Sequence, residues 1–176
     1  MSALENFTRW VYVMQQIHEA QHYIGRAEAI GHPCLWTSYE SIWDFLAFFK
    51  GALNSYAKCF VGAGSGRRKL ESSHVFKHHE ALAQKHDEIM ALRHRYVAHP
   101  DKNDFESANV AQEDSDTELV LRLQYGLSFP FDRLYELRDL IYFIEHHVAQ
   151  SQEDHLAKIS KEIGKPVRVL QGGGNA

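Results

Sequence analysis

The sequence predicts an all-α protein, an antiparallel up-down bundle of four helices, or of five, with a minor β-hairpin around residues 107–124. The composition is that of an ordinary globular chain, with 44% hydrophobic and 24% charged residues among 176. Long stretches repeat apolar residues at steps of three and four, the spacing of one helix face. Glycine, proline and polar segments separate these stretches. Long helices with short connections favour antiparallel neighbours.

The first two helices have clear sequence boundaries. The first is predicted from Leu4 to about Ile30, where Gly31-His32-Pro33 stops it. A capping-box pattern, Thr37-Ser38-Tyr39-Glu40, begins the second helix, which runs to about Phe60. Aromatic residues cover most of the circumference of the second helix, which suits a central position in the fold or a subunit interface.

The third helix follows a glycine-rich break and carries an unusually polar stripe. Gly62-Ala63-Gly64-Ser65-Gly66 ends the second helix and precedes a basic cluster, Arg67-Arg68-Lys69, in a predicted loop. The third helix is predicted from about Ser73 to His99, because the residue before Pro100 is disfavoured in a helix. The apolar members of its stripe are Val75, Leu82, Ile89 and Tyr96, and His78, His86 and Arg93 lie beside them.

The remainder of the chain predicts a hairpin, a fourth helix and a tail. Residues 100–118 read as a polar loop, and the alternating leucines of 119–123 predict a strand. Ser128-Phe129-Pro130 opens the fourth helix, which continues to about Ile159. We therefore expect one helical-bundle domain over residues 1–163 and a flexible C-terminal tail over residues 164–176.

Charge and cysteine content exclude several classes of protein. The net charge is −4, so a polyanion must meet a local basic patch rather than the molecule as a whole. No apolar run reaches the roughly 18–20 residues of a membrane span, so no membrane partner is expected. Cys34 and Cys59 form no ligand-spaced cluster, and no signal peptide is recognisable, which favours the reducing cytoplasm.

One motif matches that of zinc proteases. His18-Glu19-Ala20-Gln21-His22 places two imidazoles on one helix face with Glu19 as a potential base, and Glu28 falls where metzincins carry a third ligand. Only 17 residues precede His18, too few for the substrate-binding sheet of those enzymes. We expect a bystander pair, with no metal site and no cofactor, and metal analysis of the purified chain tests the zinc alternative.

A second motif lies at the end of the third helix. Arg93 and His99 are six positions apart, about 9 Å along a helix axis, so both side chains could reach one phosphate. Arginine binds phosphate oxygens through its planar fork, and histidine can remove a proton and return it. These two groups suffice for metal-free RNA cleavage. In the alternative interpretation, Arg93 pairs with an acid inside the bundle and His99 is a helix-terminal residue favoured by the dipole.

The surrounding residues resemble the signature of the HEPN superfamily, in which an arginine, a polar residue, four further residues and a histidine end a helix. Arg93-His94 matches the first pair and His99 the histidine. Ala98-His99-Pro100-Asp101-Lys102 is similar to the Ala-His-x-Asp-Lys of the abortive-infection-type branch. Arg95 offers a second, closer arginine-to-histidine spacing.

The resemblance implies a homodimer of helical bundles whose motifs face one another in a composite cleft, acting as a ribonuclease of toxin or defence type. His99 would be general base and acid, Arg93 would stabilise the phosphorane, and His94 would orient the substrate or the motif. The residues expected to bind RNA phosphates are Arg95, Arg67, Arg68 and Lys69. The implied partners are an RNA substrate and an antitoxin or nucleotidyltransferase. A second hypothesis keeps the fold without the chemistry, as a module that binds a nucleotide, RNA or a protein partner.

Overall fold

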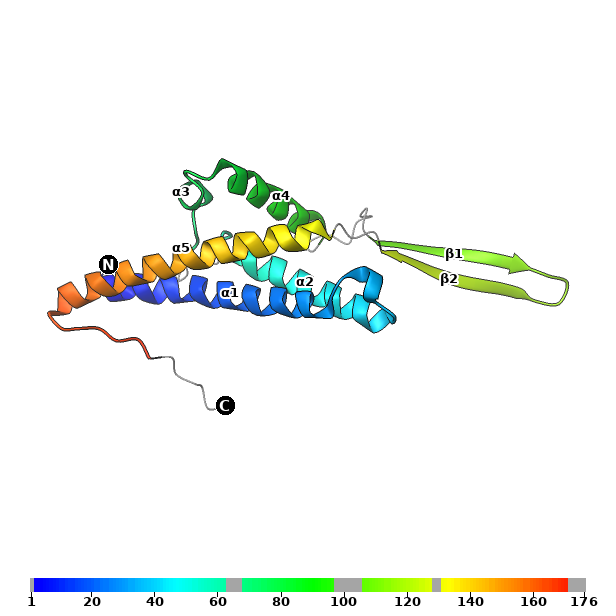
Figure 1. Ribbon diagram of the computed structural model, residues 1–176, viewed down its shortest axis with the longest axis horizontal. Coiled ribbons are helices and arrows are strands. Elements are labelled where there is room, and N and C mark those ends of the chain that lie inside the picture. Colours follow the sequence, from blue (N-terminus) through cyan, green and yellow to red (C-terminus); the bar gives the residue numbers. More distant parts are fainter. Residues whose placement is uncertain (1, 63–67, 97–105, 128–130, 171–176) are drawn as a thin grey trace.

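The computed structural model describes residues 2–62, 68–96, 106–127 and 131–170, and it is mostly helical with one two-stranded sheet. The elements in chain order are α1 (Ala3–Ile30), η1 (Pro33–Leu35), α2 (Tyr39–Lys58), α3 (Ser72–Val75), α4 (Glu80–Tyr96), β1 (Glu106–Asp114), β2 (Leu119–Leu127) and α5 (Asp132–Ile163). Helices α2 and α5 both pack along α1 and run opposite to it, and α4 lies against α2 and α5 (Figure 1).

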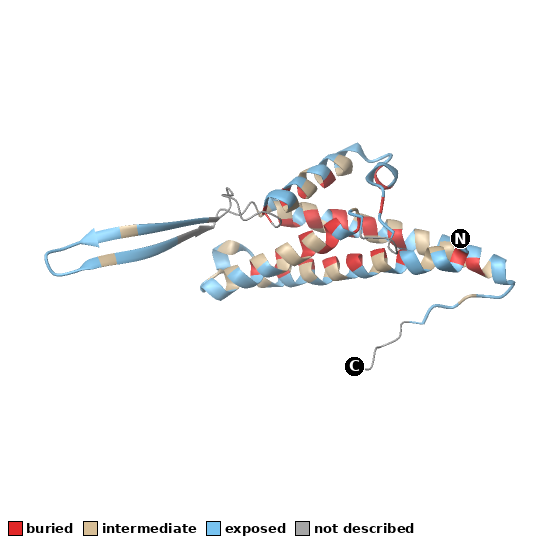
Figure 2. Ribbon diagram, turned by 180° about the vertical axis from the view of Figure 1, so that it is seen from behind, coloured by how far each residue is buried: buried red, intermediate tan, exposed pale blue. Residues whose placement is uncertain are grey.

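The core lies between the long helices (Figure 2). Buried positions on α1 and α5 recur at steps of three and four, as their sequences predict. Phe45, Phe49 and Tyr56 of α2 are fully buried, whereas Tyr39 and Trp43 in its first turns are exposed. The aromatic residues of α2 therefore divide between the core and the surface.

The helix starts differ from the predicted caps. The N-cap of α2 is Ser38 and not Thr37, because the Ser38 hydroxyl accepts the amide of Ser41. The capping box lies instead at α1, where the hydroxyl of Ser2 accepts the amide of Glu5 and the Glu5 carboxylate accepts the amide of Ser2.

The third predicted helix is two helices, so the expected continuous helix from Ser73 is wrong. The chain leaves the helix at Phe76, between α3 and α4. Val75 and Phe76 are adjacent and both buried, and Phe76 stacks on Phe60 of the chain after α2 and on Phe143 of α5. The break lets both apolar side chains reach the core, whereas adjacent positions of one helix diverge by about 100°.

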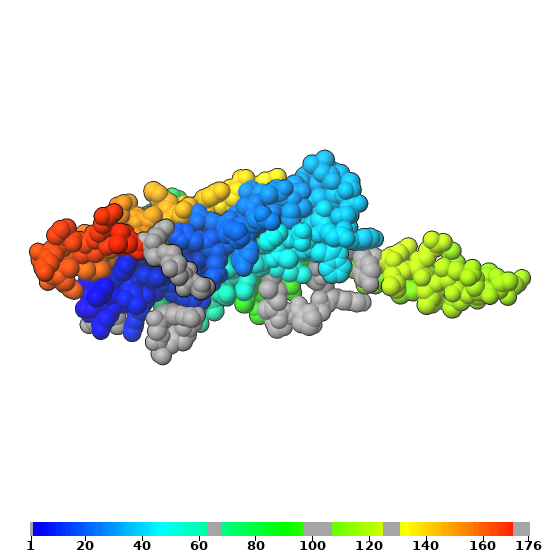
Figure 3. Space-filling view, turned by 90° about the horizontal axis from the view of Figure 1, so that it is seen from below, coloured from blue at the N-terminus to red at the C-terminus, as the bar shows by residue number. Residues whose placement is uncertain are grey.

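The predicted hairpin is confirmed, with strands longer by one to three residues at their outer ends. Val110 lies opposite Leu123 in the register, and the turn is held by Ser115, whose hydroxyl accepts the amide of Glu118. The apolar side chains of Val110, Leu121 and Leu123 share one face and are more than half exposed. The hairpin stands clear of the helical body (Figure 3).

Helix α5 ends four residues beyond the predicted Ile159, at Ile163, where Gly164 takes the left-handed conformation with φ of 67°. The chain then continues to residue 170 without regular structure. The predicted opening of this helix at residues 128–130 lies outside the described residues. Within the described part, no helix is both long and apolar enough to cross a membrane.

Candidate functional site

The last turn of α4 presents three consecutive basic residues, Arg93, His94 and Arg95. His94 and Arg95 are exposed, and Arg93 is half-buried. Cations at this position are favoured by the negative end of the helix dipole. The dipole alone therefore accounts for basic residues here, but it does not account for the burial of Arg93.

The guanidinium of Arg93 has an incomplete set of partners. Its Nε is buried and has no hydrogen-bond partner, and no carboxylate in the described part of the chain pairs with it. The half-buried arginines Arg133 and Arg138 of α5 each contact two carboxylates. The alternative in which Arg93 pairs with an acid inside the bundle finds no support among the described residues.

Apolar packing and a hydrogen bond to α5 both hold the C-terminal half of α4 in place. Ile89, Leu92 and Tyr96 are buried against the core. Glu88 accepts a hydrogen bond of 2.6 Å from Arg133 of α5, which ties the two helices together and lowers the pKa of the Glu88 carboxyl. These contacts hold the backbone that carries Arg93.

Lys50 of α2 is a further cation at this end of α4, and it was not among the predicted site residues. Its Nζ lies 4.4 Å from the centre of the Tyr96 ring. In the sequence, Lys50 interrupts an apolar stretch of the second helix between Phe49 and Gly51. This isolated lysine within an apolar stretch is the sequence feature that could have indicated a role for Lys50 at the site.

Some of the remaining predicted site residues lie outside the described residues, and others lie far from the end of α4. His99, Pro100 and the rest of the motif beyond Tyr96 lie outside the described residues, as does Arg67. Arg68 and Lys69 are described and lie at the other end of the molecule, where the guanidinium of Arg68 is 5.5 Å from the centre of the Trp10 ring. A single chain thus does not bring Arg68 and Lys69 to the end of α4.

The zinc-protease motif has no third ligand at hand. His18 and His22 are exposed on α1, and Glu19 accepts hydrogen bonds from Ser55 and Gln15. Glu28, the residue at the metzincin third-ligand offset, is ion-paired with Arg138. Among the described residues, no three His, Cys, Asp or Glu side chains cluster as a metal site would require.

One polar member of the α4 stripe belongs to the core. His86 is buried, and its Nδ1 lies 2.7 Å from the hydroxyl of Tyr56. Burial lowers the pKa of the His86 imidazole, an effect opposed by Asp87, and burial raises the pKa of Tyr56. The pair satisfies polar groups inside the fold and takes no part in the candidate site.

No family model, no curated protein and no solved structure matches the chain.

Proposed function

We propose that this protein is a HEPN-like, metal-independent endoribonuclease that works as a homodimer in the cytoplasm. The observation that carries the proposal is the guanidinium of Arg93, half-buried at the end of α4 with no carboxylate partner in the described part of the chain. A charged group so placed favours an external anion, and a phosphate accepts two hydrogen bonds from one guanidinium.

The reaction needs one base that becomes an acid and one stabilising cation. The imidazole of His99 removes the proton of a ribose 2′-OH, and the 2′-oxygen forms a bond to the adjacent phosphorus. The bond from phosphorus to the 5′-oxygen breaks, and the imidazolium returns its proton to that oxygen. Arg93 stabilises the negative charge of the phosphorane. The products are a 2′,3′-cyclic phosphate and a 5′-hydroxyl end.

A dimer explains how an acidic chain could hold RNA. Two copies of the α4 end would place two sets of Arg93, Arg95 and Lys50 around one groove, with His94 orienting the substrate. We propose that α1, α2, α4 and α5 form the antiparallel bundle from which such a dimer is built. An antitoxin or nucleotidyltransferase partner would regulate the activity by covering the groove.

Incubation of the purified protein with end-labelled RNA, followed by mapping of the new ends, tests the proposal. We expect 2′,3′-cyclic phosphate ends in the presence of EDTA, and no products from His99→Ala, which should remain a folded dimer. Cleavage that requires a divalent metal, or full activity without His99, would overturn the proposal. Binding without cleavage across several RNAs would instead support a binding module.

A further inference from the structure

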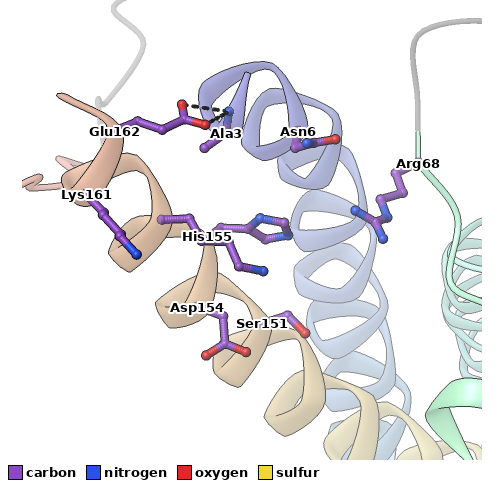
Figure 4. Close-up of a pocket in the computed structure, with 9 residues that line it drawn as sticks. Ala3, Asn6, Arg68, Ser151, Asp154, His155, Lys161 and Glu162 are labelled. Carbon is purple, nitrogen blue, oxygen red and sulfur yellow. Dashed lines mark hydrogen bonds between the residues drawn. The ribbon is translucent and has the colours of Figure 1, made fainter. Parts of the chain in front are cut away.

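A groove at the opposite end of the molecule lies between the first turns of α1, the last turns of α5 and the segment 68–75. Two adjoining hollows, of about 700 and 600 Å³, share Asn6, Arg68, Ser151 and His155 in their walls. Figure 4 shows Arg68 and His155 reaching toward α1 from the segment after α2 and from α5. We call this hollow the α1–α5 groove.

The groove forms where the seam between α1 and α5 becomes polar. Buried residues of α5 recur along one face through Ile144 and Val148 to Ile159, and Ser151 and His155 occupy the same stripe between them. On α1, Asn6 lines the groove one turn before the buried Trp10, and the rings of Phe7 and Trp10 lie 6.4 and 5.6 Å from the ring of His155. The α1–α5 seam is therefore lined in part by polar side chains where the groove lies.

Cationic groups outnumber anionic ones around the groove. The cations are Arg9, Arg68, Lys69, Lys158 and Lys161, and the carboxylates are Glu71, Asp154 and Glu162. Lys69 is paired with Glu71, and Glu162 accepts the amide of Ala3 at the start of α1. Arg9 and Arg68 have no carboxylate partner in the described part of the chain, so positive charge remains available in a molecule of net charge −4.

The side chain of Trp10 packs against two residues that line the groove, His155 and Arg68. Its ring lies 5.6 Å from the ring of His155 and 5.5 Å from the guanidinium carbon of Arg68. Trp10 is 4% exposed, and its indole Nε1 is buried with no hydrogen-bond partner among the described residues. A buried donor without an acceptor is uncommon in a folded protein.

Two histidines of the groove, His155 and His147, have lowered pKa values, mainly because they are partly buried. Burial lowers the pKa of His155, and the positive charges of Arg68 and Lys158 lower it further, with Asp154 opposing them. Burial, and then the neighbouring His146, lowers the pKa of His147, which also lines the groove. The contribution of Arg68 and Lys158 to the pKa of His155 agrees with the excess of cations around the groove, and these cations favour an anion there.

We propose that the α1–α5 groove binds a phosphate group, held by Arg9 and Arg68 with Asn6, Ser151 and His155 as hydrogen-bond partners, separately from the cleavage site proposed above. The Trp10 ring in the groove wall is covered, so it offers no open aromatic face for a base. The phosphate belongs either to a small phosphate ester or to an RNA backbone. Titration with one probe of each kind distinguishes these two sources.

Calorimetric titration of the full chain with pyrophosphate and with a short oligouridylate tests the proposal. The titrations use a double variant, Arg93→Ala with His99→Ala, as the background, because the proposed cleavage site would otherwise bind both probes and cleave the oligonucleotide. We expect saturable binding of at least one probe, weakened about tenfold or more by Arg68→Gln, because a charge-assisted hydrogen bond is lost. Pyrophosphate binding would assign the site to a small phosphate ester, and binding of the oligonucleotide alone would assign it to RNA.

The matched control is Arg26→Gln, since Arg26 is also an exposed arginine of the helical body that lies over an aromatic ring, that of Phe48, at 5.3 Å. The control should bind as that background does. Lys158→Gln, a second exposed residue of the groove, should also weaken binding. Absence of saturable binding of both probes, or equal affinities of the Arg68→Gln and Arg26→Gln variants, would overturn the proposal.

The proposal stands apart from the ribonuclease. The background with Arg93→Ala and His99→Ala lacks the phosphate-binding groups of the proposed cleavage site, and it should still bind pyrophosphate in a manner that depends on Arg68. If the unmodified protein cleaves no RNA but binds pyrophosphate through Arg68, the ribonuclease proposal fails and the groove remains.

Discussion

Two arginines on neighbouring helices contrast in their surroundings. Arg133 of α5 reaches Glu88 on α4 and Glu136 on its own helix, and these contacts raise the pKa of its guanidinium. Arg93 of α4 has a buried Nε with no hydrogen-bond partner in the described part of the chain. The ion pairs of Arg133 therefore contribute to the packing of α5 on α4, whereas Arg93 has a hydrogen-bond donor that the described residues do not use.

This contrast predicts opposite stability changes for matched substitutions. Arg133→Met should lower the melting temperature by roughly 2–4 °C, because two carboxylates lose their partner. Arg93→Met should leave it unchanged or raise it by up to about 3 °C, because an unsatisfied polar group is removed. Thermal unfolding followed by circular dichroism checks both, and equal losses would contradict the assignment of Arg93 to binding.

A second prediction at the residue scale concerns pH. Burial lowers the pKa of His86 below its usual 6.5, so the unfolded chain binds a proton at a higher pH than the folded chain does. The free energy of unfolding should be greatest above about pH 6.5 and should fall as the pH decreases further, since protonation favours unfolding. Urea titrations at pH 7.5 and pH 5.5 measure the difference.

His86→Gln should reduce that pH dependence without abolishing it, since burial also lowers the pKa values of His147 and His155. His18→Gln, a substitution at the exposed surface of α1, should behave as the unmodified protein. An undiminished pH dependence in His86→Gln would show that the buried Tyr56–His86 pair does not titrate as described.

At the scale of elements, the sequence predicts the long helices well and the third helix poorly. The apolar stripes of α1 and α5 follow one period, and glycine at residues 31 and 164 marks their ends. Periodicity cannot detect the break at Phe76, because that break depends on stacking with Phe60 and Phe143, which are distant in sequence. Tertiary contact overrides local pattern at this point.

The hairpin is an element whose removal should not affect the rest of the fold. Its exposed face and its position beyond the helical body imply few stabilising contacts with the core (Figure 3). Replacement of residues 108–125 by a short glycine-serine linker should change the melting temperature of the helices by less than about 3 °C. A large loss of stability would show that the strands contribute to the helical core.

At the scale of the whole molecule, the sequence indicates the motif but misses the α1–α5 groove. Arg93, His94 and Arg95 are found from their spacing, and the structure adds Lys50 beside Tyr96. The groove joins α1, the segment after α2 and α5, so no local motif reveals it. The available signs were the basic residues Arg68 and Lys69, which were predicted to bind RNA phosphates, and a pair of polar residues, Ser151 and His155, within an apolar stripe.

The proposed composite cleft requires two chains. Light scattering of the purified protein should give twice the 20.3 kDa mass of one chain at micromolar concentration. Arg93→Ala should keep that mass, because the proposed role of the guanidinium is to bind RNA and not to hold the dimer together. A monomeric mass at these concentrations would mean that the site contains one motif and not two, and it would contradict the proposed dimeric ribonuclease.

The rate of RNA cleavage by Arg93→Ala and by the matched Arg95→Ala tests the central claim most directly. We predict that Arg93→Ala lowers the turnover rate by about 100-fold or more, because it removes charge stabilisation in the transition state. Arg95→Ala, at an exposed site of the same helix turn, should weaken RNA binding with little change in turnover. Equal turnover by the unmodified protein and Arg93→Ala would contradict the claim.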